Sequence, residues 1–331
     1  MEASVIVKEK RIEVRSHLEK TFCRQIKKDV YNGLTASKKS IPSKYFYDSR
    51  GSELFEKICY LPEYYPTRTE MSILKHAAPQ ITNDFPEGDL VELGSGANWK
   101  IRMLLDSIDP SHLDAYRYVP VDVSESALIS ASEELLKIYP SLKVLGIIAD
   151  FLHHMDAVPN DRPRLILFLG STIGNFTEKE QRRFLNTISS SMKSEDRLLV
   201  GFDMIKPKET LEAAYNDSKG ITSKFNKNVL HVMNRELNAN FNPSHFEHLA
   251  FYNEDKGQVE MHLQAQRKVE VAINDLDLII ELEKNETIHT EISSKFSQRR
   301  IEQIVEDSGL SVNRWFNDSS KWFSLAELVL K

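Results

Sequence analysis

Cysteine is scarce in this chain of 331 residues, which contains only Cys23 and Cys59. Two cysteines can build neither a disulfide framework nor a four-thiolate zinc site. Two cysteines suffice for one disulfide bond, but we favour the interpretation that both are free thiols in a reducing cytosol. The chain also lacks a run near the ~18 consecutive apolar residues of a membrane helix, and its first 15 residues do not resemble a secretory signal. We therefore expect a soluble, cytoplasmic protein.

An excess of positive charge is also missing. The chain has 43 basic and 49 acidic residues, a formal net charge of −6 and a pI near 6.0, whereas nucleic-acid binders usually carry a strongly basic face. Lys224, Lys227 and Arg235 form a thin basic stripe that is more typical of a solvated helix face. We expect a small-molecule substrate, no nucleic-acid or membrane partner, and a monomer.

Short apolar segments alternate with amphipathic segments from about residue 88 onward, and this alternation predicts a parallel, doubly wound α/β sheet. The predicted strands are residues 89–93, 118–122, 144–148, 165–169 and 198–202. Thr67 with Glu70 and Thr177 with Glu180 each fit a capping box, which predicts that a helix begins at each threonine. An earlier helix is predicted from the stripe of Leu18, Phe22, Ile26 and Val30, with Gly33 as its stop.

The C-terminal third has a different pattern. Longer antiparallel strands are predicted over residues 259–271, 276–282 and 286–293, followed by a helix that stops at Gly309 and by strands over 312–315 and 323–330. We expect a Rossmann-like domain made of residues 70–205 and 296–331. An inserted α+β lobe for the substrate is expected to comprise residues 1–69 and 206–295.

A glycine motif, Glu92-Leu93-Gly94-Ser95-Gly96, ends the first strand of the parallel sheet. Glycines at this point let the backbone turn tightly and approach a ligand at the carboxyl ends of the strands. The third glycine of the dinucleotide fingerprint would fall at position 99, which is Trp99, and this disfavours NAD and FAD. A plain strand-to-helix turn is the alternative interpretation of the motif.

Two further strand ends carry residues suited to a nucleoside. Asp122, after the second strand, is placed to accept both ribose hydroxyls, although it can instead cap the next helix in competition with Ser124. Asp150 and Phe151, after the third strand, can receive an adenine amino group and cover its ring. Together the three strand ends resemble those of the class I S-adenosylmethionine (SAM) methyltransferases, which release S-adenosyl-L-homocysteine. The resemblance implies these cofactor-binding residues: Glu92, Gly94, Ser95, Gly96, Lys100, Asp122, Asp150 and Phe151.

No metal site is expected. His153-His154 and His245-Phe246-Glu247-His248 do not match the H-E-x-x-H zinc motif, and no cysteine cluster supports them. Surface or core histidines are the default interpretation.

Four longer segments narrow the resemblance. These are Tyr45-Phe46-Tyr47-Asp48, residues 61–70 (LPEYYPTRTE), residues 169–175 (LGSTIGN) and Phe225-Asn226-Lys227-Asn228. In this order and spacing they resemble the L-histidine Nα-methyltransferases of ergothioneine biosynthesis, which use SAM three times to make the betaine hercynine. The resemblance runs from about Tyr31 to the C-terminus.

The family resemblance implies roles for individual residues. Tyr47 and Tyr64 match the catalytic tyrosines that hold the amine, and Asn175 and Tyr215 match the residues that bind the carboxylate. Glu291 and Ser293 match the pair that reads the imidazole ring, and Met261 matches a methionine of the side-chain pocket. Taken singly, Tyr64 and Met261 would be interpreted as packing residues and Glu291 as an outward-facing strand residue. It is their joint occurrence in family order that favours function.

Methyl transfer from a sulfonium needs a neutral amine aligned with the methyl group. A proton must leave the amine, and two routes stay open: Tyr47 or Tyr64 relaying through a water molecule, or loss to solvent before binding. Two alternatives to the histidine enzyme also stay open, namely a methyltransferase of the same build for another amino acid such as tryptophan, and a non-catalytic SAM-binding module.

Overall fold

The computed structural model describes residues 4–9, 11–17, 21–96 and 98–331. The chain divides into two compact units. The first unit contains the described residues before position 18, Pro66–Ile205 and Phe296–Lys331, and the second contains residues 21–65 and Lys206–Lys295. Each unit is described by itself.

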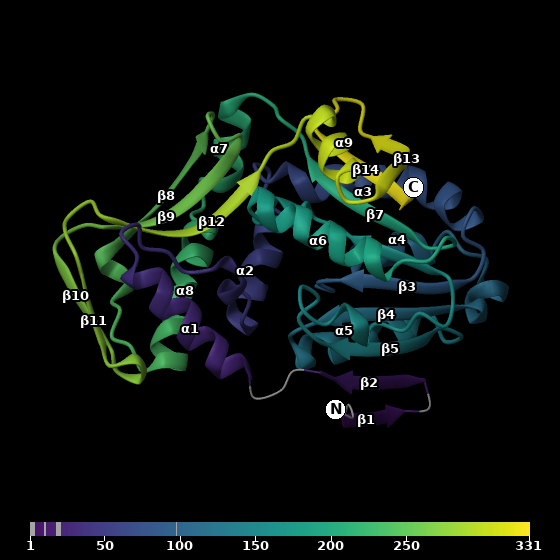
Figure 1. Cartoon of the computed structure of the whole chain (residues 1–331), viewed down its shortest axis with the longest axis horizontal. Coiled ribbons are helices and arrows are strands. Elements are labelled where there is room, and N and C mark those ends of the chain that lie inside the picture. Colours follow the sequence, from purple (N-terminus) through teal and green to yellow (C-terminus); the bar gives the residue numbers. More distant parts are fainter. Residues whose placement is uncertain (1–3, 10, 18–20, 97) are drawn as a thin grey trace. The chain divides into compact units, whose positions relative to one another are not determined.

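The first unit is built on a nine-stranded sheet with the order β1-β2-β5-β4-β3-β6-β7-β14-β13 (Figure 1). The five central strands β5, β4, β3, β6 and β7 run parallel to one another. Strand β14 pairs antiparallel with both β7 and β13. The central order is that of a doubly wound sheet, so the predicted α/β fold is confirmed. The strands are β1 Ser4–Glu9, β2 Ile12–Ser16, β3 Gly88–Leu93, β4 Tyr116–Asp122, β5 Lys143–Ile148, β6 Arg164–Phe168, β7 Arg197–Asp203, β13 Leu310–Asn317 and β14 Phe323–Leu330.

Helices cover both faces of this sheet, as its wholly buried strands β3 and β6 require. On one face, α3 (Tyr65–Asn83), α4 (Trp99–Leu105) and α5 (Glu125–Ile138) share an apolar cluster with the strands. On the other, α6 (Glu178–Ser191) and α9 (Gln298–Glu306) pack into a second cluster. Four short 3-10 helices lie in the connections: η2 Pro110–Ala115, η3 Met155–Ala157, η4 Thr172–Asn175 and, in the second unit, η1 Ser43–Phe46.

The two predicted capping boxes have different outcomes. At Thr177 the prediction is confirmed, because the Thr177 hydroxyl accepts the Glu180 N–H and the Glu180 carboxylate accepts the Thr177 N–H. At Thr67 it is wrong, since α3 already begins at Tyr65. Glu70 is fully buried and its carboxylate binds the Gly170 N–H and the Lys100 ammonium instead of its own helix end.

The N-terminal segment also departs from the prediction, which assigned residues 1–69 to the substrate lobe. Strand β2 pairs parallel with β5 and antiparallel with β1, so both belong to the sheet of the first unit. Helix α1 runs over Thr21–Thr35 and therefore passes through Gly33, where a Cβ would lie 2.2 Å from the Ser40 carbonyl oxygen. Leu18, the first residue of the predicted stripe, lies outside the described residues.

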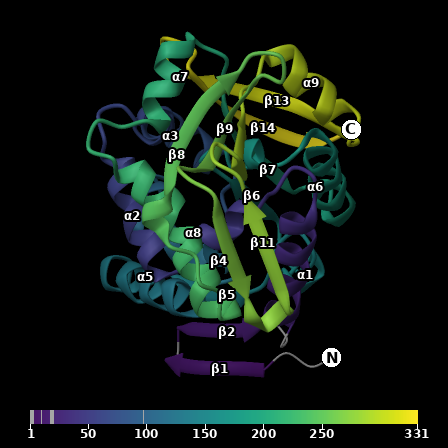
Figure 2. The same ribbon diagram turned by 90° about the vertical axis from the view of Figure 1, so that its left-hand side faces the viewer.

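The second unit combines helices with two small antiparallel sheets, β12-β9-β8 and β10-β11. The predicted strand 259–271 is divided into β9 (Gln258–Ala265) and β10 (Val269–Ile273), while β11 (Leu278–Leu282) and β12 (Thr287–Ser294) follow the prediction. Strand β8 (Phe246–Asn253) is an addition to it. Helix α8 (Ile221–Leu237) packs against β8, β9 and α2 (Ser49–Cys59), with α7 (Lys208–Tyr215) beside β8 (Figure 2). Two more 3-10 turns are η5 Pro243–His245 and η6 Asn274–Leu276.

Across the described part of the chain, the helices are all too short or too polar to be membrane-spanning segments.

Candidate functional site

The turn after β3 has the backbone that the glycine motif predicts. Gly94 adopts a φ of 73°, which favours glycine, and its N–H donates to the Val121 carbonyl of β4 at 2.9 Å. A Cβ on Gly94 would lie 3.8 Å from the Phe151 ring, so the ends of β3 and β5 are close together. The Ser95 hydroxyl is buried without a hydrogen-bond partner among the described residues. This exposed turn beside an unpaired hydroxyl suits a polar ligand.

Two carboxylates stand at the neighbouring strand ends. Glu92 is buried and accepts a hydrogen bond from the Tyr118 hydroxyl at 2.5 Å. Burial raises the pKa of Glu92 to about 7, and the nearby Asp122 acts in the same direction. Burial also raises the pKa of Asp122 to about 6. Two carboxylates that are costly to ionise in the free protein favour a ligand that brings hydrogen-bond donors.

The helix after β4 is capped by Ser124 and not by Asp122. Ser124 is the N-cap of α5, because its hydroxyl accepts the Ala127 N–H. The Asp122 carboxylate accepts the Ser124 N–H at 2.9 Å and a second backbone hydrogen bond from Val123, which leaves lone pairs unused. The carboxylate thus keeps acceptor capacity, consistent with its predicted ribose role.

Asp150 and Phe151 follow β5 in a tight turn. The Asp150 carboxylate accepts the Leu152 N–H at 2.9 Å and lies 3.0 Å from the His153 ring nitrogen Nδ1. The Phe151 ring packs edge-on against Phe168, with ring centroids 5.5 Å apart. The ring is therefore held beside the Gly94 turn, while the adenine contacts stay a prediction.

Lys100 has a partner that the sequence does not reveal. Its ammonium lies 2.7 Å from the fully buried Glu70 carboxylate, whose other oxygen accepts the Gly170 N–H at 2.7 Å. Gly170 has a φ of 80°, and a Cβ there would come within 2.9 Å of the Lys100 ammonium. The Glu70–Lys100 pair thus joins α3, α4 and the loop after β6. Lys100 is placed at the predicted cofactor edge as half of an ion pair.

In the second unit, one face of the strand pair β9 and β12 collects three predicted substrate residues. Side chains alternate along a strand, so Glu291 and Ser293 face the same way. The register sets Glu291 directly opposite Met261, which is 2% exposed. Tyr215, at the end of α7, donates its hydroxyl hydrogen to the Ser293 oxygen at 2.8 Å. Four of the predicted substrate-binding residues are therefore brought together.

Lys295 completes this group and was absent from the prediction. Its side chain is 1% exposed, and its ammonium donates to the Ser293 oxygen at 2.8 Å and to the Tyr215 oxygen at 3.1 Å. The available signal was the two-residue spacing from Ser293, which puts Lys295 on the same face. With two donors directed at its oxygen, the Ser293 hydroxyl has its own hydrogen left to donate.

Glu291 is the unpaired member of the group. Its Oε2 atom is buried and has no hydrogen-bond partner among the described residues. Burial raises the pKa of Glu291 to about 8, against the opposing effect of Lys295. Leaving a buried carboxyl oxygen unpaired costs ~1–3 kcal/mol or more. The site therefore fits a ligand that supplies a polar hydrogen at this point.

Aromatic rings surround the predicted amine position. Tyr47 contacts Phe55 and Phe225 edge-on at centroid distances of 5.6 and 5.5 Å. Tyr64 lies 6.2 Å from Phe55 and 6.3 Å from Tyr215, also edge-on. Burial raises the pKa of Tyr64 well above 10, so its phenol stays neutral at pH 7. Tyr64 is suited to accept a hydrogen bond and to present a ring face to a cation, but not to act as an ionised base.

The Phe225-Asn226-Lys227-Asn228 motif has a structural role in this unit. Asn226 is fully buried, donates to the His262 carbonyl and to His248 Nδ1, and accepts the Thr290 hydroxyl at 2.7 Å. Asn228 donates to the Asp48 carboxylate at 2.7 Å. The motif thus ties α8 both to β12, next to Glu291, and to the segment that carries Tyr47.

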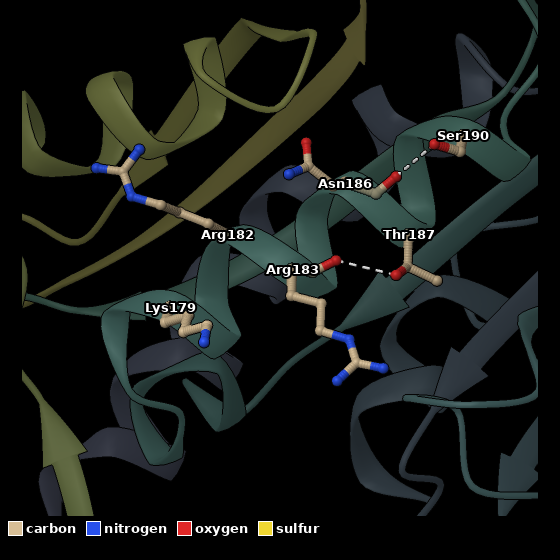
Figure 3. A pocket seen from close by; sticks show the side chains of 6 residues that line it. All are labelled: Lys179, Arg182, Arg183, Asn186, Thr187 and Ser190. Carbon is tan, nitrogen blue, oxygen red and sulfur yellow. Dashed lines mark hydrogen bonds between the residues drawn. The ribbon is translucent and has the colours of Figure 1, made fainter.

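Asn175 is the last residue of η4 and belongs to the first unit, whereas Tyr215 belongs to the second. Their joint binding of a carboxylate stays a prediction. A shallow hollow along the outer face of α6, lined by Lys179, Arg182, Arg183, Asn186, Thr187 and Ser190, contains none of the predicted site residues (Figure 3).

We expect Asp122→Ala to weaken SAM binding about 10- to 100-fold, because two charge-assisted hydrogen bonds of ~1.5–3 kcal/mol each are lost against partial compensation by water. Calorimetric titration with SAM measures this. Asp114→Ala, which removes an exposed carboxylate of the same unit, is the matched control and should bind as the unmodified protein does. Equal affinity of both variants would contradict the assignment of Asp122.

The affinity for SAM measured in this titration should depend on pH. The ribose hydroxyls of SAM are expected to donate to the ionised carboxylate of Asp122. Because the pKa of Asp122 is raised, this carboxylate takes up a proton as the pH falls through about 6. Affinity should therefore be full above this range and fall below it. Asp122→Asn should lack this step, while any step near pH 7 from Glu92 persists in both proteins.

Comparison with known proteins identifies the family of this chain. A family model described as "Histidine-specific methyltransferase, SAM-dependent" matches residues 26–330. A histidine N-alpha-methyltransferase of Mycolicibacterium smegmatis is 40% identical, covering 92% of this chain and 94% of that protein. One from Mycobacterium tuberculosis is 39% identical over 96% of this chain and 98% of its own length. Ergothioneine biosynthesis protein 1 of Schizosaccharomyces pombe is 34% identical, over 80% of this chain and 36% of that protein.

The family model spans residues 26–330, and the two mycobacterial relatives are matched over almost their full length, so the similarity includes most of both units. The chain belongs to the family of SAM-dependent, histidine-specific methyltransferases.

Proposed function

We propose that this protein transfers methyl groups from SAM to the α-amino group of L-histidine, three times in succession, to give hercynine for ergothioneine biosynthesis. Membership of the histidine-specific family and the names of the relatives support the reaction class. The observation that carries the choice of histidine is the buried, unpaired carboxyl oxygen of Glu291 beside the Ser293 hydroxyl.

The residues of the first unit fit SAM. The positive φ of Gly94 permits a close approach of the ligand, the buried Ser95 hydroxyl is unpaired among the described residues, and the raised pKa of the Asp122 carboxylate favours a ligand that brings hydrogen-bond donors. When bound, SAM supplies a methyl group already activated by its sulfonium. The protein therefore needs to hold the acceptor in line and not to activate the donor.

The imidazole ring matches the polar atoms on the β9 and β12 face. A neutral imidazole has one N–H donor and one nitrogen acceptor. Glu291 Oε2 can accept the N–H, and the hydrogen of the Ser293 hydroxyl can be donated to the other nitrogen, because Lys295 and Tyr215 already donate to the Ser293 oxygen. Met261, opposite Glu291, supplies an apolar wall. This complementary pair of contacts selects a ring with two nitrogens.

The amine end has a different requirement, because its charge increases as methyl groups are added. Tyr64 and Tyr47 offer neutral phenol oxygens and ring faces, which stabilise a methylammonium cation without a fixed partner. The tyrosines can therefore accommodate each successive product. Since the Tyr64 phenol stays neutral, it can pass a proton to water but does not remove one as a phenolate.

Incubating the purified protein with methyl-labelled SAM and each of the twenty amino acids separates this function from its alternatives. Label should pass to L-histidine and, by mass spectrometry, accumulate as the trimethylated product. Asp122→Ala should reduce the transfer at limiting SAM. A faster transfer to tryptophan would favour a sister activity, and the absence of any transfer with intact SAM binding would favour a non-catalytic SAM-binding module.

We further expect Glu291→Ala to lose most of its kcat/KM for histidine while discriminating less against tryptophan and phenylalanine. In the unmodified protein, an amino acid that lacks ring nitrogens at the two imidazole positions leaves the Glu291 carboxyl buried and unpaired, at a cost on the order of 2–5 kcal/mol. The variant removes this cost. The measurement is kcat/KM for histidine and tryptophan, with SAM affinity as the control, which should be nearly unchanged.

An unaltered preference for histidine in Glu291→Ala would mean that Glu291 is a strand residue without a role in recognition, and the physical basis of the substrate assignment would be lost.

A further inference from the structure

Three side chains that commonly bind metal ions meet on the reverse face of the β9 and β12 strand pair. Glu260 and His262 alternate with Met261 along β9, so they point away from the Glu291 face. The register sets His289 of β12 directly opposite His262. One potential ligand atom from each of these three residues lies within 4.8 Å of the other two. The pairs His153-His154 and His245 with His248 are not part of this cluster.

Two ring nitrogens in the cluster are buried and unsatisfied. His262 Nδ1 and His289 Nε2 have no hydrogen-bond partner among the described residues. The two rings are close, with centroids 4.8 Å apart. His289 also makes a hydrogen bond to the backbone of Glu291. Buried polar atoms are rarely left unpaired, and a bond from a second ring atom to the main chain is the usual support of a metal-binding histidine.

Glu260 is held so that one oxygen faces the histidines. Its Oε1 atom accepts hydrogen bonds from Asn253, Lys256 and Gln258 at 2.9–3.0 Å. Its Oε2 atom lies 3.3 Å from His262 Nε2. Ligand atoms of a tetrahedral zinc ion with bonds of ~2.1 Å are about 3.4 Å apart. Glu260 Oε2 and His262 Nε2 therefore already have the spacing of two metal ligands, and the third ligand atom would be the unpaired His289 Nε2, with His262 Nδ1 left outside the set.

Both histidines are in the state that binds metals. Burial lowers the pKa of His262 and of His289 against the opposing effect of Glu260, and the His262 ring lowers that of His289 further, so both are neutral at pH 7. Two imidazole nitrogens and one carboxylate oxygen suit Zn²⁺ and similar transition metals, whereas Mg²⁺ and Ca²⁺ prefer oxygen ligands alone.

The cluster is largely buried. The side chains of His262 and Glu260 are 14% and 9% exposed. Lys256 bonds to Glu260, but its side chain is 60% exposed and can turn outward when a cation arrives. Phe251 stacks on the His262 ring at 5.5 Å and fixes its plane.

We propose that Glu260, His262 and His289 form a binding site for one divalent transition-metal ion of the Zn²⁺ class. The strand register shifts between His289 and Glu291, with Thr290 in the bulge. An ion bound to His289 would therefore fix β12 immediately behind the residue proposed to read the imidazole ring. The site lies apart from methyl transfer itself, and it stands whether or not histidine is the substrate.

Titrating the metal-free full-length protein with Co²⁺ tests this site, because Co²⁺ replaces Zn²⁺ and its visible absorption reports nitrogen ligands. We expect one equivalent to bind, with absorption bands typical of four- or five-coordinate Co²⁺ that Zn²⁺ abolishes. His289→Ala and Glu260→Gln should each weaken binding at least tenfold. His153→Ala, which alters the exposed histidine pair, is the matched control and should bind as the unmodified protein does.

Thermal unfolding of the same proteins shows whether each variant is folded. Zn²⁺ should raise the Tm of the unmodified protein and of His153→Ala, but not that of His289→Ala or Glu260→Gln. The proposal is overturned if Co²⁺ does not bind, if it binds equally to folded His289→Ala, or if His153→Ala abolishes its binding.

Discussion

A carboxyl group buried without a partner is the constraint around which the second unit is arranged. Glu291 Oε2 has no hydrogen-bond partner among the described residues, and burial raises the pKa of this group to about 8. Such a group lowers the stability of the free protein. Lys295 offsets little of this loss of stability, because its ammonium is hydrogen-bonded to Ser293 and Tyr215. A ligand with a correctly placed polar hydrogen removes the cost, whereas a ligand without one does not. Selectivity follows from this difference.

The surrounding residues keep Glu291 in place. Asn226 accepts the Thr290 hydroxyl and donates to the His262 carbonyl, so helix α8 holds the irregular part of β12. Phe225, the preceding residue, packs against Phe46 and Tyr47. One short helical motif therefore positions both the strand that carries Glu291 and the ring cluster around Tyr47. In the first unit, the Glu70–Lys100 pair similarly joins α3 and α4 to the loop that precedes η4.

The sequence predicted the parallel sheet well, because strands such as β6 are apolar after their first residue, Arg164, and alternate with amphipathic helices. It failed where a local pattern was overridden by distant contacts. Thr67 and Glu70 have the spacing of a capping box, yet Glu70 is drawn into a buried ion pair 30 residues away in sequence at Lys100. Strand β2 was missed because its partner β5 lies more than 100 residues later, and β1 joins the sheet only through β2. Lys295 was missed because a lone lysine after a strand gives no sign of burial.

The central claim is that both ring nitrogens of the acceptor are read, one by Glu291 and the other by Ser293. Comparing kcat/KM for L-histidine with that for the two analogues methylated on one ring nitrogen or the other tests it most directly. The account predicts that both analogues are poor acceptors, since neither has a ring N–H in its neutral form to donate to Glu291, one of them also loses the acceptor nitrogen that faces Ser293, and each adds bulk to the site. Methylation of either analogue as efficiently as histidine itself would contradict it.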